Sequence, residues 1–162
     1  MSRRDRNKPY FERVSGAPEP VAYEIRRRLT FSEADVMGIS WYGRYPQFFE
    51  EASTELGRRC GLSFEDYFQS GLRAPIAELH VDYFCPLMLD EEFNVRASII
   101  WNEAARINTE YRVTKIDGTV ATSGYRVQVL TEASTGKVCL ISPELLVRFR
   151  RRWMDGEFKG LR

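Results

Sequence analysis

The amino-acid sequence predicts an α+β fold in which a curved antiparallel β-sheet wraps around one long central α-helix. Three observations predict it: one segment has apolar residues at helical spacing, several later segments alternate apolar and polar residues, and short connections join those later segments. Short connections make neighbouring strands antiparallel, because a parallel crossover needs about a dozen residues or more. The sheet and the helix then bury their apolar faces against each other.

The first strand follows a polar arm. Residues 1–20 contain three prolines and few apolar residues, so we expect a flexible or loosely docked N-terminal arm. Residues 21–31 mix β-formers with charged side chains and predict the first strand, which ends in a turn over residues 32–38. We expect one domain over residues 21–152, a size that suits a single core, and a C-terminal tail over residues 153–162.

The long helix is the clearest element. Its apolar residues recur three and four positions apart and therefore lie on one face. Pro46 suits a first helical turn, where its missing N–H is not needed, and Gly61 is a typical C-terminal stop. A second short helix is expected over residues 63–69. The apolar positions of the long helix are Tyr45, Phe48, Phe49, Ala52 and Leu56.

The remaining strands begin after Pro75, where the apolar residues change from helical spacing to alternation. The Asp117-Gly118 pair between two of these strands predicts a hairpin with a two-residue type I′ turn. Pro143 opens a short terminal helix that reaches Phe149. The expected strands are residues 77–83, 93–101, 107–113, 125–129 and 138–141.

Composition and charge narrow the function classes. Hydrophobic residues make up 43% of the chain, which predicts a packed globular domain. With 24 Lys and Arg against 23 Asp and Glu, the net charge of +1 provides no long-range field that attracts nucleic acid or an anionic membrane. Basic residues nevertheless cluster, as is typical of solvated faces or of a contact with a phosphorylated cofactor. The clusters are Arg3, Arg4, Arg6 and Lys8; Arg26, Arg27 and Arg28; and Arg148, Arg150, Arg151 and Arg152.

The sequence lacks signals for metal binding and secretion. The three cysteines lie far apart, and the one histidine, His80, offers no His-rich ligand set, so we expect no metal site and no metal or redox cofactor. His80 itself is expected on the polar face of a strand. Residues 1–20 hold no apolar secretion segment, and no apolar run approaches the ~20 residues that span a bilayer. We therefore expect a cytoplasmic protein with no membrane contact.

Asp35 is the main candidate for a catalytic residue. It lies in the turn before the long helix, where unpaired backbone N–H groups and the positive end of the helix dipole converge. A carboxylate there can attack a carbonyl carbon or activate water while N–H groups polarise the carbonyl oxygen. On this chemistry alone, an aspartate near a helix start is more often a cap than a catalyst.

The residues around Asp35 resemble the 4-hydroxybenzoyl-CoA thioesterase family and related acyl-CoA thioesterases of the hotdog fold. The shared pattern is an aspartate, two residues, a glycine and an aromatic-rich entry into the central helix, which here is DVMGISWY at residues 35–42. The resemblance covers roughly Val21 to Phe149 and includes the segments PIAE at 75–78, CPL at 85–87 and TGK at 135–137. It favours the catalytic interpretation of Asp35 over the capping one.

The resemblance implies a role for each residue of the site. Asp35 acts either as a nucleophile that forms a mixed anhydride or as a general base on water, and both mechanisms stay open. The backbone N–H of Tyr42 binds the thioester oxygen, and Gly38 lets the backbone approach the substrate. Glu33, two residues before Asp35, is interpreted as a spare carboxylate. The expected substrate contacts are Trp41, Tyr45 and Phe49, together with Arg148 and Arg150 for the phosphates of CoA.

Glu50 and Glu51 are expected to be surface charges of the helix, although a second thioesterase lineage of this fold takes its base from the helix. The sequence thus predicts hydrolysis of an acyl-CoA thioester to a carboxylic acid and free CoA, by a homodimer or homotetramer with active sites at subunit interfaces. Coenzyme A is then part of the substrate and not a cofactor. Two alternatives stay open: a thioesterase for acyl-carrier-protein substrates, and an acyl-CoA binding module without hydrolysis.

Overall fold

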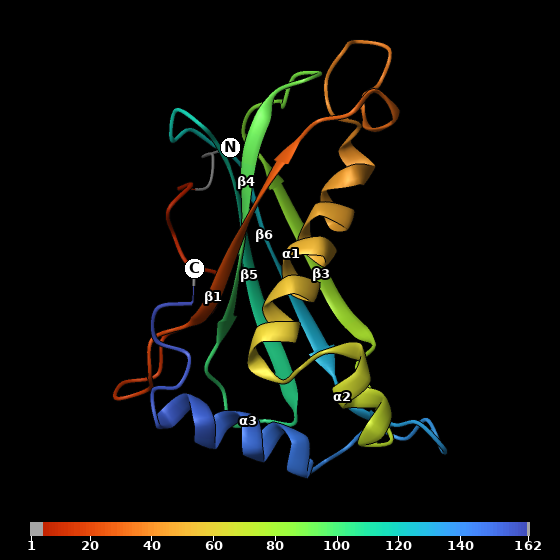
Figure 1. Ribbon diagram of the computed structural model, residues 1–162, viewed down its shortest axis with the longest axis vertical. Coiled ribbons are helices and arrows are strands. Elements are labelled where there is room, and N and C mark those ends of the chain that lie inside the picture. The colour runs from red at the N-terminus through yellow and green to blue at the C-terminus, as the bar shows by residue number, and fades with distance from the viewer. Residues whose placement is uncertain (1–4, 162) are drawn as a thin grey trace.

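A computed structural model describes residues 5–161 and shows a sheet curved around one long helix (Figure 1). Arg3 and Arg4 of the first basic cluster lie outside the described residues. The predicted fold class is confirmed. The elements in chain order are β1 (Val21–Arg28), η1 (Phe31–Glu33), η2 (Tyr42–Arg44), α1 (Tyr45–Cys60), α2 (Phe64–Gln69), β2 (Leu72–Arg73), β3 (Ile76–Tyr83), β4 (Glu92–Ile100), β5 (Arg106–Lys115), β6 (Val120–Val129), β7 (Thr131–Glu132) and α3 (Glu144–Met154).

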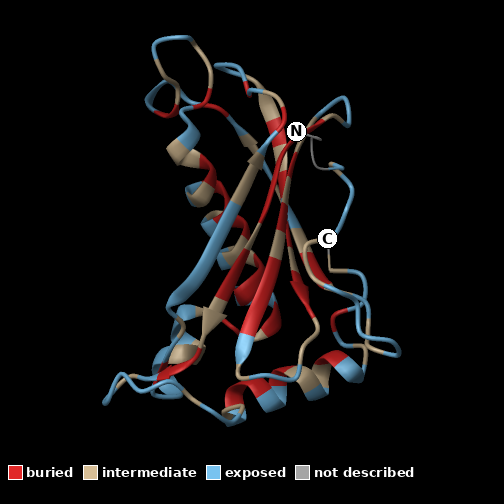
Figure 2. Cartoon of the chain, turned by 180° about the vertical axis from the view of Figure 1, so that it is seen from behind, coloured by how far each residue is buried: buried red, intermediate tan, exposed pale blue. Residues whose placement is uncertain are grey.

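The main sheet has five antiparallel strands in the order β1-β4-β5-β6-β3. Because β3 pairs with β6, the chain crosses the sheet between β3 and β4 although these strands are neighbours in sequence. β1 and β3 are therefore the two edges. β3 is exposed along most of its length, and it stands out as such in Figure 2.

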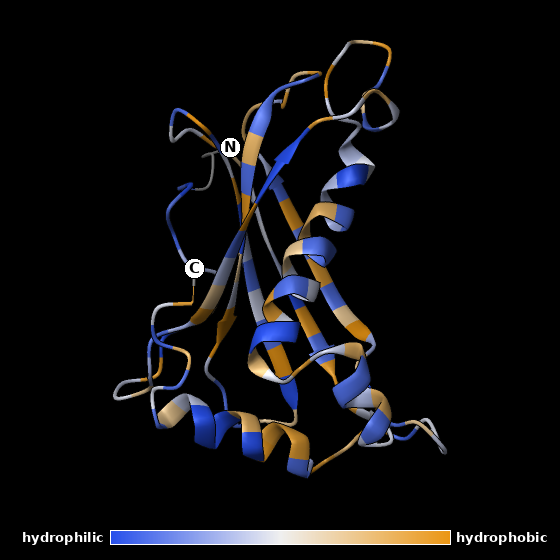
Figure 3. Cartoon of the chain, in the orientation of Figure 1, coloured by the Kyte–Doolittle hydropathy of each residue, from blue (hydrophilic) through white to orange (hydrophobic). Residues whose placement is uncertain are grey.

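The core lies between α1 and the concave face of the sheet. The apolar side of α1 faces the strands, and its outer side is polar (Figure 3). Phe49 on α1 stacks on Tyr111 of β5 with ring centroids 4.3 Å apart. Gly124 of β6 permits this close approach, because a Cβ atom there would lie 2.9 Å from the Phe49 ring and 2.3 Å from the carbonyl oxygen of His80. The predicted apolar face of the helix is thus the buried one.

Gly61 ends α1 as predicted, with a left-handed φ of 80° and its N–H bonded to the carbonyl of Gly57. The predicted type I′ turn at Asp117-Gly118 is wrong. Of these two residues, Gly118 alone has a positive φ, and its N–H bonds the carbonyl of Lys115, so the loop has three residues, 116–118. Asp117 has a negative φ, and its carboxylate accepts the Thr119 N–H at 2.8 Å, which closes the turn from the side chain.

The strand predicted at residues 138–141 is also wrong. Val138 makes a single bridge to Thr131, and Leu140 and Ile141 are exposed as the chain leaves the sheet for α3. The helix predicted after Pro143 is present as α3 and runs past residue 152. Two residues of the expected C-terminal tail, Trp153 and Phe158, are buried in the core.

The described part of the N-terminal arm lies on the side of the sheet opposite α1 (Figure 1). The Tyr10 hydroxyl lies 2.6 Å from both the Asp82 carboxylate and the Ser123 hydroxyl. Trp153 donates its indole N–H to the carbonyl of Glu19 at 2.7 Å, which joins α3 to the end of the arm just before β1. Among residues 5–161, no helix has the length and apolarity needed to cross a membrane.

Candidate active site

The aspartate-x-x-glycine segment before α1 forms a tight turn. The Gly38 N–H donates to the Asp35 carbonyl at 3.0 Å, and the Asp35 N–H donates to the carbonyl of Ile39 at 2.8 Å. Gly38 has a φ of 74°, a conformation that a side chain disfavours, and no atom lies within 4 Å of the place where its Cβ would be. The spacing of the motif is therefore the spacing of this turn, and the space beside Gly38 is open to a ligand.

Backbone hydrogen bonds hold the turn against two neighbouring segments. The Ser40 N–H donates to the Leu87 carbonyl at 2.9 Å, and the Leu89 N–H donates to the Gly38 carbonyl at 2.9 Å. The Trp41 N–H donates to the Glu33 carbonyl at 2.9 Å, which pairs the two legs of the loop. Asp35 and Tyr42 thus lie on adjacent legs of one anchored loop.

Glu33 supports this loop from its buried side. One carboxylate oxygen of Glu33 accepts the Thr30 N–H at 2.9 Å, and the other accepts Arg27 Nη2 at 2.7 Å. Burial alone raises the pKa of Glu33, but the hydrogen bonds from Thr30 and Arg27 outweigh burial and leave the pKa below its ordinary value. Arg27 also pairs with Glu51 on α1 at 2.7 Å, so the charges connect β1, the loop and the helix.

The Asp35 carboxylate is only partly engaged. One oxygen accepts the Met37 N–H at 2.8 Å, and the described part of the chain offers the carboxylate no other hydrogen bond. The residue as a whole is partly buried. One oxygen of the Asp35 carboxylate therefore makes the local capping bond, and the other oxygen is available to react with a substrate or with water.

The Tyr42 backbone N–H is the first of η2, which leads directly into α1. Within residues 5–161, no acceptor receives this N–H, whereas the carbonyl of Tyr42 accepts the Tyr83 hydroxyl at 2.8 Å. A backbone N–H without an acceptor at the N-terminus of a helix attracts negative charge. The loop hence presents one available carboxylate oxygen and one available N–H donor.

The other expected substrate contacts lie in different places. Trp41 and Tyr42 are exposed beside the loop, with ring centroids 5.1 Å apart. Tyr45 and Phe49 are 2% and 1% exposed and belong to the core, and neither lines the cavity between α1, α2 and the sheet. A helical face looks the same in sequence whether it meets a core or a ligand, so the pattern did not separate these two roles.

Arg148 and Arg150 lie on α3, at the end of the molecule opposite the loop that precedes α1 (Figure 1). Arg148 is exposed. Arg150 donates to the Ser142 hydroxyl at 2.7 Å and to the Glu103 carbonyl at 3.3 Å, and so ties α3 to the loop before β5. Within one chain, neither arginine reaches Asp35.

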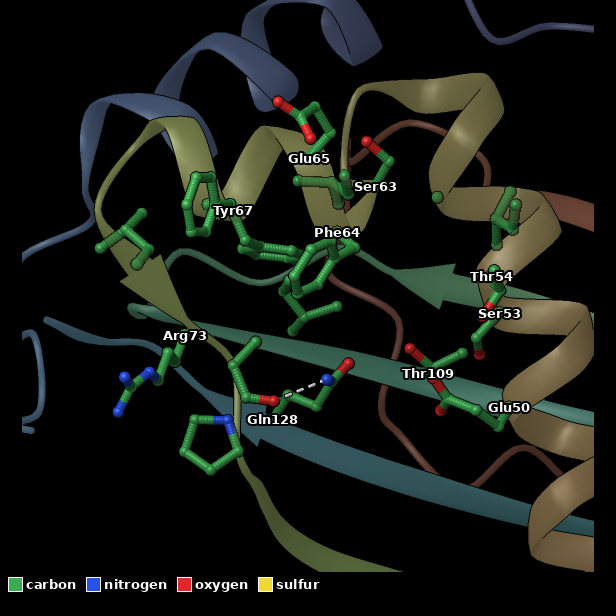
Figure 4. A pocket seen from close by; sticks show the side chains of 18 of the residues that line it. Glu50, Ser53, Thr54, Ser63, Phe64, Glu65, Tyr67, Arg73, Thr109 and Gln128 are labelled. Carbon is green, nitrogen blue, oxygen red and sulfur yellow. Dashed lines mark hydrogen bonds between the residues drawn. The ribbon is translucent and has the colours of Figure 1, made fainter. Parts of the chain in front are cut away.

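A cavity of about 1220 Å³ opens between α1, α2 and the sheet (Figure 4). Apolar residues of α2 and of the strands form one wall, with Phe64 and Phe68 at the rim. Ser53, Thr54 and Thr109 give the other wall hydroxyl groups. No pattern in the sequence predicted this cavity, although the paired phenylalanines of α2 leave an apolar surface that such a small helix cannot bury by itself. Asp35 and Tyr42 are not part of its lining.

Glu50 and Glu51, the two carboxylates of α1 considered as alternative bases, are both paired. Glu50 forms an ion pair with Arg126 at the edge of the cavity, and Glu51 pairs with Arg27. His80 is exposed on β3 and lies 3.1 Å from the Asp82 carboxylate. In residues 5–161, no three His, Cys, Asp or Glu side chains gather as a metal site would require. Burial raises the pKa of the Cys60 thiol to about 12, which makes this cysteine a poor nucleophile.

Residues 29–149 match the sequence profile of a known protein family, the thioesterase-like superfamily. An esterase candidate of Aquifex aeolicus (strain VF5) is 29% identical over 121 residues, which cover 75% of this chain and 92% of that protein. The acyl-CoA thioester hydrolase YbgC of Escherichia coli is 21% identical over 132 residues, or 82% of this chain and 92% of the relative.

Solved structures share the fold. A DHNA-CoA thioesterase from Staphylococcus aureus has a TM-score of 0.70 at 22% identity, over 85% of this chain and 89% of that one. Another Staphylococcus aureus protein, solved in complex with CoA, has a TM-score of 0.72 at 16% identity, over 92% and 90% of the two chains. The hotdog fold expected from the resemblance is confirmed, while the narrower 4-hydroxybenzoyl-CoA thioesterase family stays a prediction. The chain belongs to the thioesterase-like superfamily.

Proposed function

We propose that this protein hydrolyses acyl-CoA thioesters, with Asp35 as the catalytic carboxylate and the Tyr42 N–H as the donor to the thioester oxygen. The observation that carries the proposal is the anchored loop, which holds an available carboxylate oxygen and an available N–H beside the start of a helix. A thioester carbonyl placed between these two groups is polarised at oxygen and open to attack at carbon.

Two routes complete the reaction with the same groups. As a nucleophile, the Asp35 carboxylate adds to the thioester carbon, the C–S bond breaks to release CoA thiolate, and water then hydrolyses the mixed anhydride. As a general base, Asp35 removes a proton from water, which adds to the same carbon before the C–S bond breaks. In both routes the Tyr42 N–H stabilises the negative oxygen of the tetrahedral state, for which one donor contributes roughly 10²–10³ in rate.

The placement of the cavity supports an active site shared between two chains. In one chain, the cavity lies along the later turns of α1, whereas Asp35 precedes the helix. If two β3 edges pair antiparallel, the loop of one chain approaches the α2 end of its partner. Ile76, Leu79 and Tyr83 give the β3 edge an exposed apolar surface that suits such pairing. We therefore propose a homodimer in which the partner's cavity receives the acyl group. A homotetramer built from two such dimers would keep the same pairing of β3 edges within each dimer.

CoA is the proposed carrier because the name of the Escherichia coli relative is acyl-CoA thioester hydrolase and because a protein of the same fold was solved with CoA. An acyl-carrier-protein substrate is the second candidate, since both carriers present the same thioester. Hydrolysis of one acyl group supplied on CoA and on carrier protein separates the two. The cytoplasmic location and the lack of a cofactor stay predictions from the sequence.

The test is replacement of Asp35 by Asn, followed by thiol-release assays over a set of acyl-CoAs. We expect kcat to fall about 100-fold or more, because the amide neither attacks nor accepts a proton. The thermal unfolding temperature should stay near that of the wild type, since the amide oxygen still accepts the Met37 N–H. Asp155→Asn, at an exposed aspartate after the end of α3, is the matched control and should keep full activity. A folded Asp35→Asn protein with more than about half of the wild-type rate would contradict the proposal.

A further inference from the structure

A second cavity lies on the other face of the sheet, under the N-terminal arm. Its volume is about 310 Å³, at the small end of the range for small-molecule sites. β4 and β5 form its floor, and residues 6–13 of the arm form its roof. Because the buried residues of β4 and β5 face α1, this cavity is separated from the candidate active site by the whole sheet. The cationic residues that line it are Arg6, Lys8, Arg13, Arg96 and Arg112.

The floor places two positive charges against each other. Arg96 on β4 and Arg112 on β5 lie directly opposite in the strand register. Like charges in this position repel each other and destabilise a strand pair. Arg112 donates to the side-chain oxygen of Asn7 at 3.2 Å, and Glu24 lies opposite Arg96 on β1. Within the described residues, neither arginine has a carboxylate in ion-pair distance. The sheet therefore keeps two unneutralised guanidinium groups under the arm.

The roof adds positive charge instead of neutralising it. Glu110 is the one carboxylate among the described lining residues, and its oxygens are already used. They accept the N–H groups of Tyr10 and Phe11 at 2.8 Å and 2.9 Å and the Arg13 guanidinium at 2.7 Å. The four arginines of the lining, set against this one carboxylate, leave a formal excess of three positive charges among those residues. An arm that carries cations is thus docked over a floor that carries cations.

We propose that this cavity binds the diphosphate group of a small phosphorylated molecule. Planar guanidinium groups bind phosphate oxygens in pairs, and the opposed Arg96 and Arg112 offer two of them at one point. A diphosphate carries enough negative charge to offset most of the excess, and the volume accommodates it. Ser98 and Ser123 line the same space with hydroxyl groups. A nucleoside diphosphate and the nucleotide end of CoA both carry this group, so both are candidate sources.

Ligand binding should also hold the arm in place. Tyr10 fixes the arm to Asp82 and Ser123, and the anion would then remove the repulsion between the arm and the floor. The basic cluster that the sequence shows before Pro9 thereby gains a role that the thioesterase site does not need. The inference does not depend on the proposed function, because no residue of the Asp35 loop takes part.

Isothermal titration calorimetry of the full chain with pyrophosphate, ADP and CoA tests the site. We expect pyrophosphate and ADP to bind once per chain, with an affinity that falls as salt is added. The double variant Arg96→Gln/Arg112→Gln should bind them roughly tenfold or more weakly, since two charged hydrogen-bond donors are lost. Arg106→Gln removes an exposed charge from the same strand outside the cavity and is the matched control, with unchanged affinity.

Two further measurements separate a ligand site from a structural role. Without ligand, the double variant should unfold at a temperature no lower than that of the wild type, because it removes a repulsive pair. Pyrophosphate should slow tryptic cleavage in residues 6–13 of the wild type and not of the double variant. If pyrophosphate, ADP and CoA bind with equal affinity, the site recognises the diphosphate group alone. If CoA binds more tightly and this binding depends on Arg96 and Arg112, the site recognises the nucleotide end of CoA. Absence of pyrophosphate and ADP binding, binding that the double variant leaves unchanged, or a marked loss of stability in that variant would overturn the proposal.

Discussion

Two carboxylates two residues apart have different environments in the loop before α1. Glu33 is buried, paired with Arg27 and bonded to the Thr30 N–H, whereas Asp35 keeps one oxygen available. Glu33 therefore has a structural role, and its charge stabilises the folded loop. Asp35 has the freedom that a catalytic group needs. The sequence placed both residues in one turn, but only their hydrogen bonds tell them apart.

Glu33→Gln should destabilise the protein by about 1–3 kcal/mol near neutral pH, because the partly buried Arg27 loses one of its two charged partners and keeps only Glu51. The folded pKa of Glu33 lies below its ordinary value of 4.5. Its contribution is thus fully present above that ordinary value and disappears as the pH falls through the lower folded pKa. Urea unfolding of both proteins across this acidic range measures the difference. Glu12→Gln, an exposed carboxylate of the arm, is the control, and a difference for Glu33→Gln that does not change with pH would contradict the role of its charge.

The close packing of α1 on the sheet depends on one glycine of β6. Gly124→Ala should lower the free energy of unfolding by about 1–3 kcal/mol, because the added methyl group meets the His80 carbonyl oxygen and the Phe49 ring. The carbonyl belongs to β3, so the edge strand should also move away from β6. Thermal unfolding reports the first effect, and faster amide hydrogen exchange in residues 76–83 reports the second. If Gly124→Ala has the stability and the hydrogen exchange of the wild type, then neither the His80 carbonyl nor the Phe49 ring lies as close to Gly124 as these contacts require.

Elements with strong local patterns were predictable, and contacts between distant segments were not. The helical spacing from Tyr45 and the stop at Gly61 located α1 almost to the residue, because both ends depend on local chemistry. Alternation likewise located β3, β4 and β5, but it located only the second half of β6, which begins at Val120 and not at residue 125. The order of the strands was out of reach, since β3 pairs with β6, a strand far along the chain. The false strand at residues 138–141 has the right composition, but no partner strand lies beside it except at Val138.

In the candidate site, too, features set by neighbouring residues were predictable and features set by distant segments were not. The turn motif located Asp35, Gly38 and the Tyr42 N–H, because their relation is set by hydrogen bonds within a few residues. The large cavity joins α1, α2 and several strands, and no local pattern reports on its existence. For the same reason, Tyr45 and Phe49 could not be assigned to core or ligand from their spacing alone.

At the scale of the whole molecule, the exposed β3 edge, the cavity and the Asp35 loop fit one arrangement of two chains. Leu79→Lys should weaken the proposed dimer, because a charge on the outer side of an edge strand opposes pairing. Sedimentation equilibrium should then show monomers, and the specific activity should rise with protein concentration. Leu140→Lys, in an exposed loop outside the sheet, should leave both properties unchanged. A Leu79→Lys dimer as stable as the wild type would exclude this edge as the interface.

Mixing two inactive variants tests whether the active site spans two chains. Asp35→Asn removes the carboxylate, and Thr54→Trp should block the cavity from an exposed position on α1. Each variant alone should be nearly inactive. In a mixed dimer, the Thr54→Trp chain contributes its intact Asp35 loop, which faces the open cavity of the Asp35→Asn chain, so one of the two sites is complete. Equal mixing after subunit exchange should therefore restore about a quarter of the wild-type activity, since half of the dimers are mixed. If each site lies within one chain, mixing restores none, and the shared site is excluded while the role of Asp35 stands.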